Sequence, residues 1–312
     1  MLSARYPKNM STRSCDLFFN QGSGSEMRSR FYELQRRLLE RGFRIRRSWL
    51  VGENLSFAKA LRELESSETP LVVVGGGDGT LSGVTPTLLK GGKLMGVVPA
   101  GTFNFFARNH NIPLSMDEAI EVIAAGTPLR VPVGKVNDEY FLNTSSFGLY
   151  PTALKKRQEH YRRWGRGRAL ALWSLASTLL GKHETYRTTL TAGEASIKTV
   201  TPFVFVSTNE LQIESMGLRG GETRTPNDLA IYVTECLDWH QRVGLAAKAL
   251  LRRLENAGEY QVTCSPHLTA DISRKSIKVA LDGELKSLCT PLEFSLVPSA
   301  LRLMVPKGTS PA

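Results

Sequence analysis

The stretch Leu71-Val72-Val73-Val74-Gly75-Gly76-Gly77-Asp78-Gly79-Thr80-Leu81 joins an apolar run to glycines that surround one carboxylate and one hydroxyl. The apolar run predicts a buried parallel strand, and residues 80–89 resume at helical spacing. Glycines let backbone N–H groups approach an anion, and a helix N-terminus favours phosphate. Asp78 would repel phosphate unless a cation such as Mg²⁺ lies between them. The stretch therefore predicts a loop for a metal–nucleotide complex; the simpler alternative is a glycine turn capped by Asp78.

Strands and helices alternate around this stretch. Apolar segments predict strands at 16–20, 43–50, 71–74 and 94–98, with helical spacing between them. Such alternation predicts an α/β fold with a doubly wound parallel sheet. Because ligands bind at the carboxyl ends of parallel strands, we expect the glycine turn at 20–25 and the loop at 75–80 to share one ligand.

The second half of the chain has a different pattern of predicted secondary structure. After about residue 132, short β-rich segments predict a mostly antiparallel domain, interrupted by helical insertions near 154–180 and 242–254. We therefore expect a nucleotide-binding domain at 15–132 and a β-rich domain at 133–306, whose C-terminal segment could return to the first domain. The predicted strands of the second domain are 139–144, 186–191, 196–206, 229–233, 260–264 and 277–281.

Composition limits the class of protein. The 312 residues include 40 Lys and Arg against 29 Asp and Glu, a formal charge of +11, which suits a nucleoside triphosphate, an anionic membrane or nucleic acid. No nucleic-acid-reading motif is present, so a nucleic-acid partner is not expected. The four cysteines are scattered, which argues against a zinc site and for a reducing cytoplasm. The N-terminus does not read as a secretory signal.

Two more turns carry polar groups. Residues 99–104 follow the fourth predicted strand and offer Thr102 and Asn104; alternatively, Thr102 is simply the N-cap of a helix. Residues 277–284 form a strand that runs into Asp282-Gly283-Glu284. An Asp-Gly pair commonly marks a hairpin, but phosphoryl transfer to an alcohol also needs a carboxylate near the acceptor hydroxyl, and Glu284 is the candidate.

Taken in order, these segments resemble the signature loops of the diacylglycerol kinase catalytic-domain superfamily, which includes bacterial lipid kinases and sphingosine kinases. The glycine–aspartate loop alone is shared with NAD kinases and phosphofructokinases, but the ordered set is specific. The resemblance covers about residues 15–306. It rests on residues 20–24, 76–80, 99–108, 141–148, 282–284 and 298–302.

The resemblance implies an NAD-kinase-like α/β domain followed by a β-sandwich-like domain, with ATP and substrate meeting in the cleft between them. Such an enzyme would transfer the γ-phosphoryl group of ATP, with Mg²⁺, to a hydroxyl of diacylglycerol or a related lipid. Glu284 would be the general base, and Asp78 would orient phosphate or phosphate-bound Mg²⁺. The nucleotide contacts would come from Asn20, Gln21, Gly22, Ser23, Gly24, Ser48, Gly76, Gly77, Asp78, Gly79, Thr80, Leu81, Ser82, Thr102 and Asn104.

The sequence departs from this family pattern at several positions. Gln21 stands where proline is common, and Phe105 stands where an aspartate is common. The second change removes a polar link near the active site. Members with an additional metal site place acidic residues before a late strand, and here only Asp228 could serve.

The segment at residues 162–173, which contains four arginines and two tryptophans, is the candidate for lipid contact. Arginines can pair with lipid phosphates while tryptophans lie at the headgroup boundary, which predicts a peripheral enzyme at the inner membrane surface of the cytoplasm. The alternative is a buried helix with a solvated basic end. A homodimer is compatible with the sequence. The predicted membrane contacts are Arg162, Arg163, Trp164, Arg166, Arg168 and Trp173.

Two other classes of function stay open at this point. A kinase of a soluble acceptor such as NAD is one, because Thr208-Asn209-Glu210 is similar to a dinucleotide-binding Asn-Glu pair. A non-catalytic basic protein that binds membrane or nucleic acid through residues 157–168 is the other.

Overall fold

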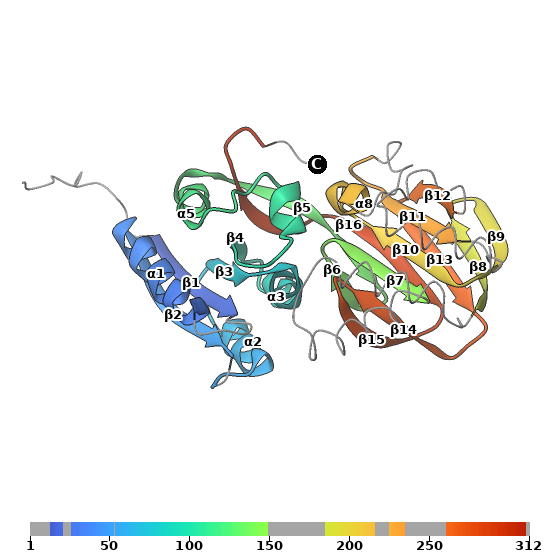
Figure 1. Cartoon of the computed structure of the whole chain (residues 1–312), viewed down its shortest axis with the longest axis horizontal. Helices are drawn as coiled ribbons and strands as arrows, with labels where there is room; N and C mark the ends of the chain where they lie inside the picture. The colour runs from blue at the N-terminus through green and yellow to red at the C-terminus, as the bar shows by residue number, and fades with distance from the viewer. Residues whose placement is uncertain are drawn as a thin grey trace, which may run out of the picture. The chain divides into compact units, whose positions relative to one another are not determined.

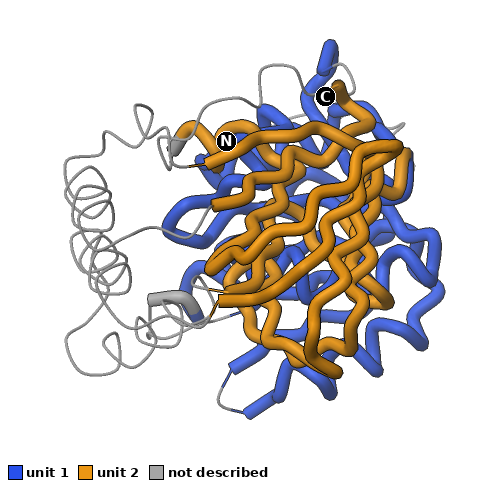
Figure 2. Tube along the Cα trace, turned by 90° about the vertical axis from the view of Figure 1, so that its right-hand side faces the viewer, with its two compact units in different colours: residues 1–131, 299–312 blue, residues 132–298 orange. Residues whose placement is uncertain are grey.

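The computed structural model describes residues 13–20, 26–52, 54–148, 185–215, 225–234 and 260–309 (Figure 1). The chain folds into two compact units, which Figure 2 colours separately. The first unit comprises residues 1–131 and 299–312, and the second unit comprises residues 132–298.

The first unit is the doubly wound parallel domain that the sequence predicts. Its sheet has the order β2-β1-β3-β4, and the last residues of β16 (Leu292–Val305) add a further parallel strand beside β4. The alternating elements are β1 (Arg13–Asn20), α1 (Glu26–Glu40), β2 (Phe43–Val51), α2 (Phe57–Glu65), β3 (Leu71–Gly76), α3 (Asp78–Lys90), β4 (Leu94–Pro99), α4 (Phe105–Asn109) and α5 (Met116–Ala125).

Helices cover both faces of this sheet because the strands are apolar on both sides. On one face, Leu17 and Phe19 of β1 pack with residues of α1 and α5 such as Leu34 and Ile120. On the other face, Phe18 contacts the ring of Phe57 at the start of α2, edge to face. Near-continuous burial along β1 and β3 is typical of strands in a parallel sheet.

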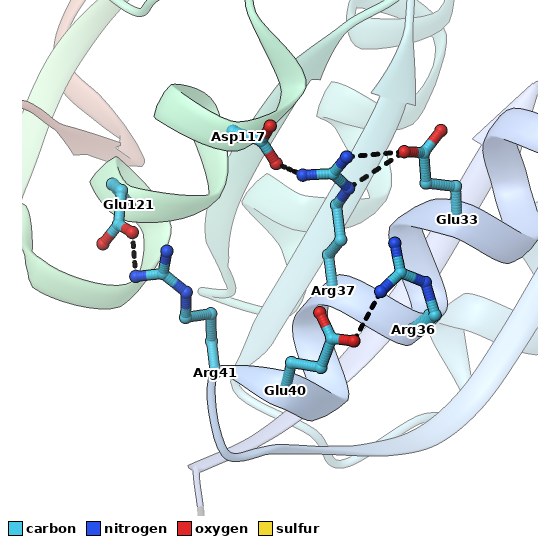
Figure 3. A network of polar contacts seen from close by, with 7 residues as sticks. All are labelled: Glu33, Arg36, Arg37, Glu40, Arg41, Asp117 and Glu121. Atoms are coloured by element: carbon cyan, nitrogen blue, oxygen red, sulfur yellow. Dashed lines mark hydrogen bonds and ion pairs between the residues drawn. The ribbon is translucent and has the colours of Figure 1, made fainter. Parts of the chain in front are cut away.

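An ion-pair network joins α1 to α5 (Figure 3). Arg37 pairs with Glu33 on its own helix and with Asp117 on α5, and Arg41 pairs with Glu121. The hydrogen bond and charge of Arg37 lower the pKa of Glu33. The network lies within the first unit and supplements the apolar contact between the two helices.

The second unit is mostly antiparallel, as the sequence predicts. One sheet has the order β12-β11-β10-β7-β14-β15, and a second group runs from residues 292–296 of β16 through β13 and β8 to β9. Side chains such as Phe147, Val204 and Phe294 form one apolar core. The elements are β5 (Thr127–Val136), β6 (Glu139–Phe141), β7 (Thr144–Gly148), β8 (Tyr186–Ala192), β9 (Ala195–Thr201), β10 (Phe203–Ser207), α8 (Glu210–Ser215), β11 (Leu229–Thr234), β12 (Tyr260–Ser265), β13 (His267–Ile272), β14 (Ser276–Leu281) and β15 (Glu284–Cys289).

Several boundaries differ from the sequence predictions. The single strand predicted at 196–206 is two strands, β9 and β10, which belong to different sheets and are separated by Pro202. Proline cannot donate to a strand ladder, and the Thr201 hydroxyl accepts a hydrogen bond from the Phe203 N–H at 3.0 Å instead. The predicted segment 139–144 is likewise divided between β6 and β7. Strands β5, β13, β15 and β16 were not predicted, and the helical insertions predicted near 154–180 and 242–254 lie outside the described residues.

Candidate functional site

The glycine–aspartate stretch is a tighter junction than the sequence predicts. Strand β3 continues through Gly76 and helix α3 begins at Asp78, so Gly77 alone separates them. The Gly77 carbonyl accepts hydrogen bonds from the N–H groups of Thr80 at 2.9 Å and Leu81 at 3.1 Å. The first turn of α3 therefore starts directly at the carboxyl edge of the sheet, where its N–H groups and its dipole favour an anion.

The lack of a side chain at the glycines of this junction serves different purposes. A Cβ at Gly75 would lie 2.2 Å from the Phe19 ring, so this position serves packing. A Cβ at Gly76 would lie 2.6 Å from the Thr80 side chain, and one at Gly77 would lie 2.9 Å from the Gly101 Cα. Gly77 therefore lets two segments of backbone meet, and Gly76 leaves room for the Thr80 side chain.

A hydrogen bond ties the end of β1 to the start of α3. The Asn20 side-chain amide donates to the Thr80 hydroxyl over 2.9 Å. This contact brings together the two glycine turns that we expect to share one ligand. The rest of the first turn, Gln21, Gly22, Ser23 and Gly24, lies outside the described residues.

The turn after β4 is closed by its own asparagine. Asn104 accepts a hydrogen bond from the Gly101 N–H at 2.9 Å and donates to the Gly101 carbonyl at 3.0 Å. Its backbone is left-handed, with φ of 52°, a conformation that asparagine tolerates better than most residues. Asn104, not Thr102, directly precedes α4, and Thr102 is exposed. The N-cap alternative for Thr102 is therefore wrong.

Asp78 links this turn to the glycine junction. Its two carboxylate oxygens accept hydrogen bonds from the N–H groups of Phe105 at 3.1 Å and Phe106 at 2.9 Å, the first residues of α4. An anion suits this position because the N-terminus of a helix carries partial positive charge. Asp78 thus reaches the backbone of residue 105, where the family often places an acidic side chain. The Phe105 ring stacks on Phe103, with ring centroids 5.4 Å apart.

Four other residues were also predicted to contact the nucleotide. Ser48 is exposed on the edge strand β2 and pairs with Leu17, three residues before Asn20 in the β1 register. Leu81 is buried in α3, whereas Ser82 and Gly79 are half-buried there. The structure therefore brings Asn20, Gly76, Gly77, Asp78, Thr80 and Asn104 together and leaves Ser48 apart from them.

In the second unit, Asp282 and Gly283 form a two-residue hairpin turn between β14 and β15. Both have positive φ, 47° and 90°, as a type I′ turn requires. Leu281 and Glu284 close the hairpin as directly opposite residues, and Glu284 is exposed. The hairpin interpretation of this motif is confirmed, and the role of Glu284 stays a prediction.

The Asp282 carboxylate also binds a distant segment. It accepts hydrogen bonds from the N–H groups of Leu142 at 2.6 Å, Asn143 at 2.8 Å and Thr144 at 2.8 Å. Behind this segment, the buried side-chain amide of Asn209 donates to the Asn143 side-chain oxygen at 2.7 Å. Sequence reasoning missed this network; the polar residues that interrupt the apolar segments 141–148 and 203–208 were the available signal.

Asp228 shows no sign of a metal cluster. Its carboxylate accepts hydrogen bonds from the Thr225 N–H at 3.2 Å and the Thr225 hydroxyl at 2.6 Å, which close the turn before β11. No group of three or more His, Cys, Asp or Glu side chains that could hold a metal occurs within the described residues. The described contacts of Asp228 are therefore those of a turn, and the additional metal site stays an expectation.

The predicted membrane contacts Arg162, Arg163, Trp164, Arg166, Arg168 and Trp173 lie outside the described residues. No helix in the described part of the chain is long and apolar enough to cross a membrane.

The chain is similar to known proteins in sequence and in fold. Residues 15–136 match the family model of the diacylglycerol kinase catalytic domain. A probable lipid kinase YegS-like of Citrobacter koseri is 34% identical over 110 residues, which are 34% of this chain and 36% of that protein. A diacylglycerol kinase of Staphylococcus epidermidis is 39% identical over 92 residues, 29% of each chain. The chain thus spans about a third of the length of the curated relatives it matches.

The fold extends the likeness over both units. The crystal structure of a diacylglycerol kinase from Bacillus anthracis superposes with a TM-score of 0.66 at 17% identity, covering 97% of this chain and 100% of that chain. At this identity the likeness concerns the fold. The match of residues 15–136 includes the β1 turn, the glycine–aspartate junction and the turn after β4. This part of the chain is therefore similar to the diacylglycerol kinase catalytic domain.

Proposed function

We propose that this protein is an ATP-dependent lipid kinase that transfers the γ-phosphoryl group to a hydroxyl of diacylglycerol or a related lipid. The observation that carries the proposal is the junction of three turns at the carboxyl edge of the first sheet. Asn20, Asp78 and Asn104 belong to three different turns, and hydrogen bonds or close backbone contacts join those turns. The match of residues 15–136 to the diacylglycerol kinase catalytic-domain model makes a phosphoryl donor the expected ligand of this edge.

The chain's own groups suit the phosphates of a nucleotide. Backbone without side chains at Gly77 and Gly101 lets the turns pack closely at this edge, and the first turn of α3 supplies N–H groups and positive potential. The Asn20–Thr80 hydrogen bond holds the two turns at a fixed separation. These groups would bind and orient the donor.

Mg²⁺ fits the donor set of this edge. Carboxylate oxygens such as those of Asp78 are among the ligands that Mg²⁺ prefers. When bound with the nucleotide, Mg²⁺ would neutralise phosphate charge. Asp78 would then hold phosphate-bound Mg²⁺ while fixing the start of α4.

Glu284 is the proposed general base. It is exposed at the start of β15, directly after a rigid two-residue turn, and could accept the proton of the lipid hydroxyl during transfer. The protein would act at the inner surface of an anionic membrane, where its acceptor resides.

The test is transfer from labelled ATP with Mg²⁺ to a panel of lipids in mixed micelles. Wild-type protein should yield a labelled lipid that extracts into chloroform. Glu284→Gln should keep its affinity for ATP and lose turnover by roughly a hundredfold or more, since a general base contributes about 10²–10⁴. Asp138→Asn, in the exposed hairpin turn between β5 and β6, is a matched control and should remain active. Unchanged turnover in Glu284→Gln would remove the assigned base.

The same assay distinguishes a lipid kinase from a kinase of a soluble acceptor. Labelled product in the aqueous phase, formed with NAD and absent with every lipid, would favour that rival. The buried side chain of Asn209 is engaged with Asn143 and Gln212, so it does not favour a dinucleotide contact.

A further inference from the structure

We infer that Asp282 is a positioning residue that fixes the hairpin turn carrying Glu284. The inference rests on the proposed function, because it gives Asp282 a role in the same reaction. Asp282 lies two residues before the proposed base, and its own carboxylate is turned toward residues 142–144.

The contact between the turn and this segment includes four hydrogen bonds. Three run from the N–H groups of Leu142, Asn143 and Thr144 to the Asp282 carboxylate, and the Asp282 N–H donates to the Thr144 carbonyl at 2.8 Å. Hydrogen bonds to a charged acceptor are stronger than neutral ones. Pairing between β14 and β7 ends at Leu281 and Ser145, so the Asp282 carboxylate extends this support from the strand to the turn itself.

The segment on which Asp282 docks is itself anchored in the interior. The Thr208 hydroxyl donates to the Leu142 carbonyl at 2.6 Å, and the Ser207 hydroxyl donates to the Asn143 carbonyl at 3.1 Å. Asn209, only 1% exposed, adds its amide to the side chain of Asn143. The segment therefore offers a rigid support, because its carbonyl and N–H groups are bound from opposite sides.

This arrangement matters for Glu284 because its side chain is exposed and long. A flexible carboxylate would spend little time in a productive position, and a misplacement of about 1 Å can cost a hundredfold in rate. Asp282 fixes the backbone from which Glu284 projects, without needing to touch the substrate. Catalytic carboxylates supported in this way by other hydrogen-bonded residues are better preorganised.

The variants Asp282→Asn and Asp282→Ala test this role in steps. Asparagine can keep the oxygen that binds the Asn143 and Thr144 N–H groups but presents an amide to the Leu142 N–H, whereas alanine removes all three bonds. We expect kcat per folded molecule to fall about tenfold in Asp282→Asn and about a hundredfold in Asp282→Ala, with the KM for ATP little changed. Asp138→Asn, the same change in another hairpin turn, should keep wild-type kcat.

A double-mutant cycle separates positioning from a general structural role. If Asp282 acts through Glu284, then Asp282→Ala should lower kcat in the wild-type background and have little further effect in the Glu284→Gln background. Equal fold losses in both backgrounds would overturn the inference. Amide hydrogen exchange of residues 142–144 should become faster in Asp282→Ala, and unchanged protection would also overturn it.

These outcomes are distinguishable from failure of the proposed function. Absence of lipid phosphorylation by the wild-type protein overturns the lipid kinase and, with it, the role of Asp282 in that reaction. Wild-type transfer with an additive cycle overturns only the positioning role. Wild-type transfer with a non-additive cycle and faster exchange supports both.

Discussion

Several buried polar side chains of the first unit have a structural role. The Ser67 hydroxyl donates to the fully buried Asp16 carboxylate, and the Lys93 ammonium donates to the carbonyls of Ser67 at 2.6 Å and Thr69 at 3.0 Å. These bonds fix the segment before β3. Burial, with a smaller contribution from the charge of Asp16, raises the pKa of Cys15 to about 12, so its thiol is not a nucleophile at neutral pH.

His110 gives the stability of the first unit a pH dependence. The imidazole is 5% exposed and packs edge to face on Phe106, and burial lowers its pKa from 6.5 to about 4. Between these values only the unfolded chain binds the proton, so the contribution of neutral His110 is complete above about pH 6.5 and is lost as the pH falls toward 4. Through this group, the free energy of unfolding should fall by on the order of 3 kcal/mol over this pH range.

The measurement is the free energy of unfolding at about pH 7 and about pH 4.5 for the wild-type protein and His110→Leu. The wild-type protein should lose more stability on acidification than the variant, because leucine takes up no proton. Equal losses would show that His110 does not titrate in this range.

At the scale of elements, the site depends on close contact between turns. A Cβ at Gly101 would lie 2.5 Å from the Gly77 Cα and 2.8 Å from the Asn104 side-chain oxygen. Gly101→Ala should therefore push the turn after β4 away from the glycine junction and weaken ATP binding by roughly tenfold or more. Gly91→Ala is the control, because Gly91 lies at the opposite end of α3 and its Cβ would approach the Lys93 side chain to 3.0 Å. Calorimetric titration with ATP would decide, and wild-type affinity in Gly101→Ala would contradict the role of this contact.

The α1–α5 network should contribute modestly and in a salt-dependent way. Arg37→Ala and Arg41→Ala each remove an ion pair to α5 between partly exposed groups, so each should cost about 0.5–1 kcal/mol at low salt and less at about 1 M salt. Arg36→Ala breaks only the pair with Glu40 within α1 and should cost less. Denaturant unfolding at the two salt concentrations measures these differences, and salt-independent losses would point to packing of the arginine stems.

The elements show why sequence prediction works better for some features than for others. The strand–turn–helix repeats of the first unit were predictable because apolar periodicity and glycine turns are local. The division of residues 196–206 was not, because both parts have strand character and only Pro202 and the pairing partners separate them. Strand β13 alternates between buried and exposed residues, a pattern that the sequence did offer.

For the whole molecule, net charge is the property with the clearest consequence. A formal charge of +11 should attract the protein to anionic membranes over a distance limited by salt screening. We predict that the full chain sediments with phosphatidylglycerol vesicles at low salt and is released at about 0.5 M salt. Phosphatidylcholine vesicles are the control. Salt-insensitive binding to both would indicate apolar insertion, and no binding to either would contradict the predicted membrane partner.

The sequence by itself determined the class of fold, the order of the turns and the residues that carry the candidate chemistry. It could do so because strand periodicity, glycine freedom and the Asp-Gly hairpin act over a few neighbouring residues. Tertiary structure alone decided what the carboxylates touch. Asp78 reaches the start of α4, 27 residues away from it, and Asp282 binds Asn143, 139 residues away from it. Hydrogen-bond partners so far apart in the chain are set by strand order and register, which no local pattern contains.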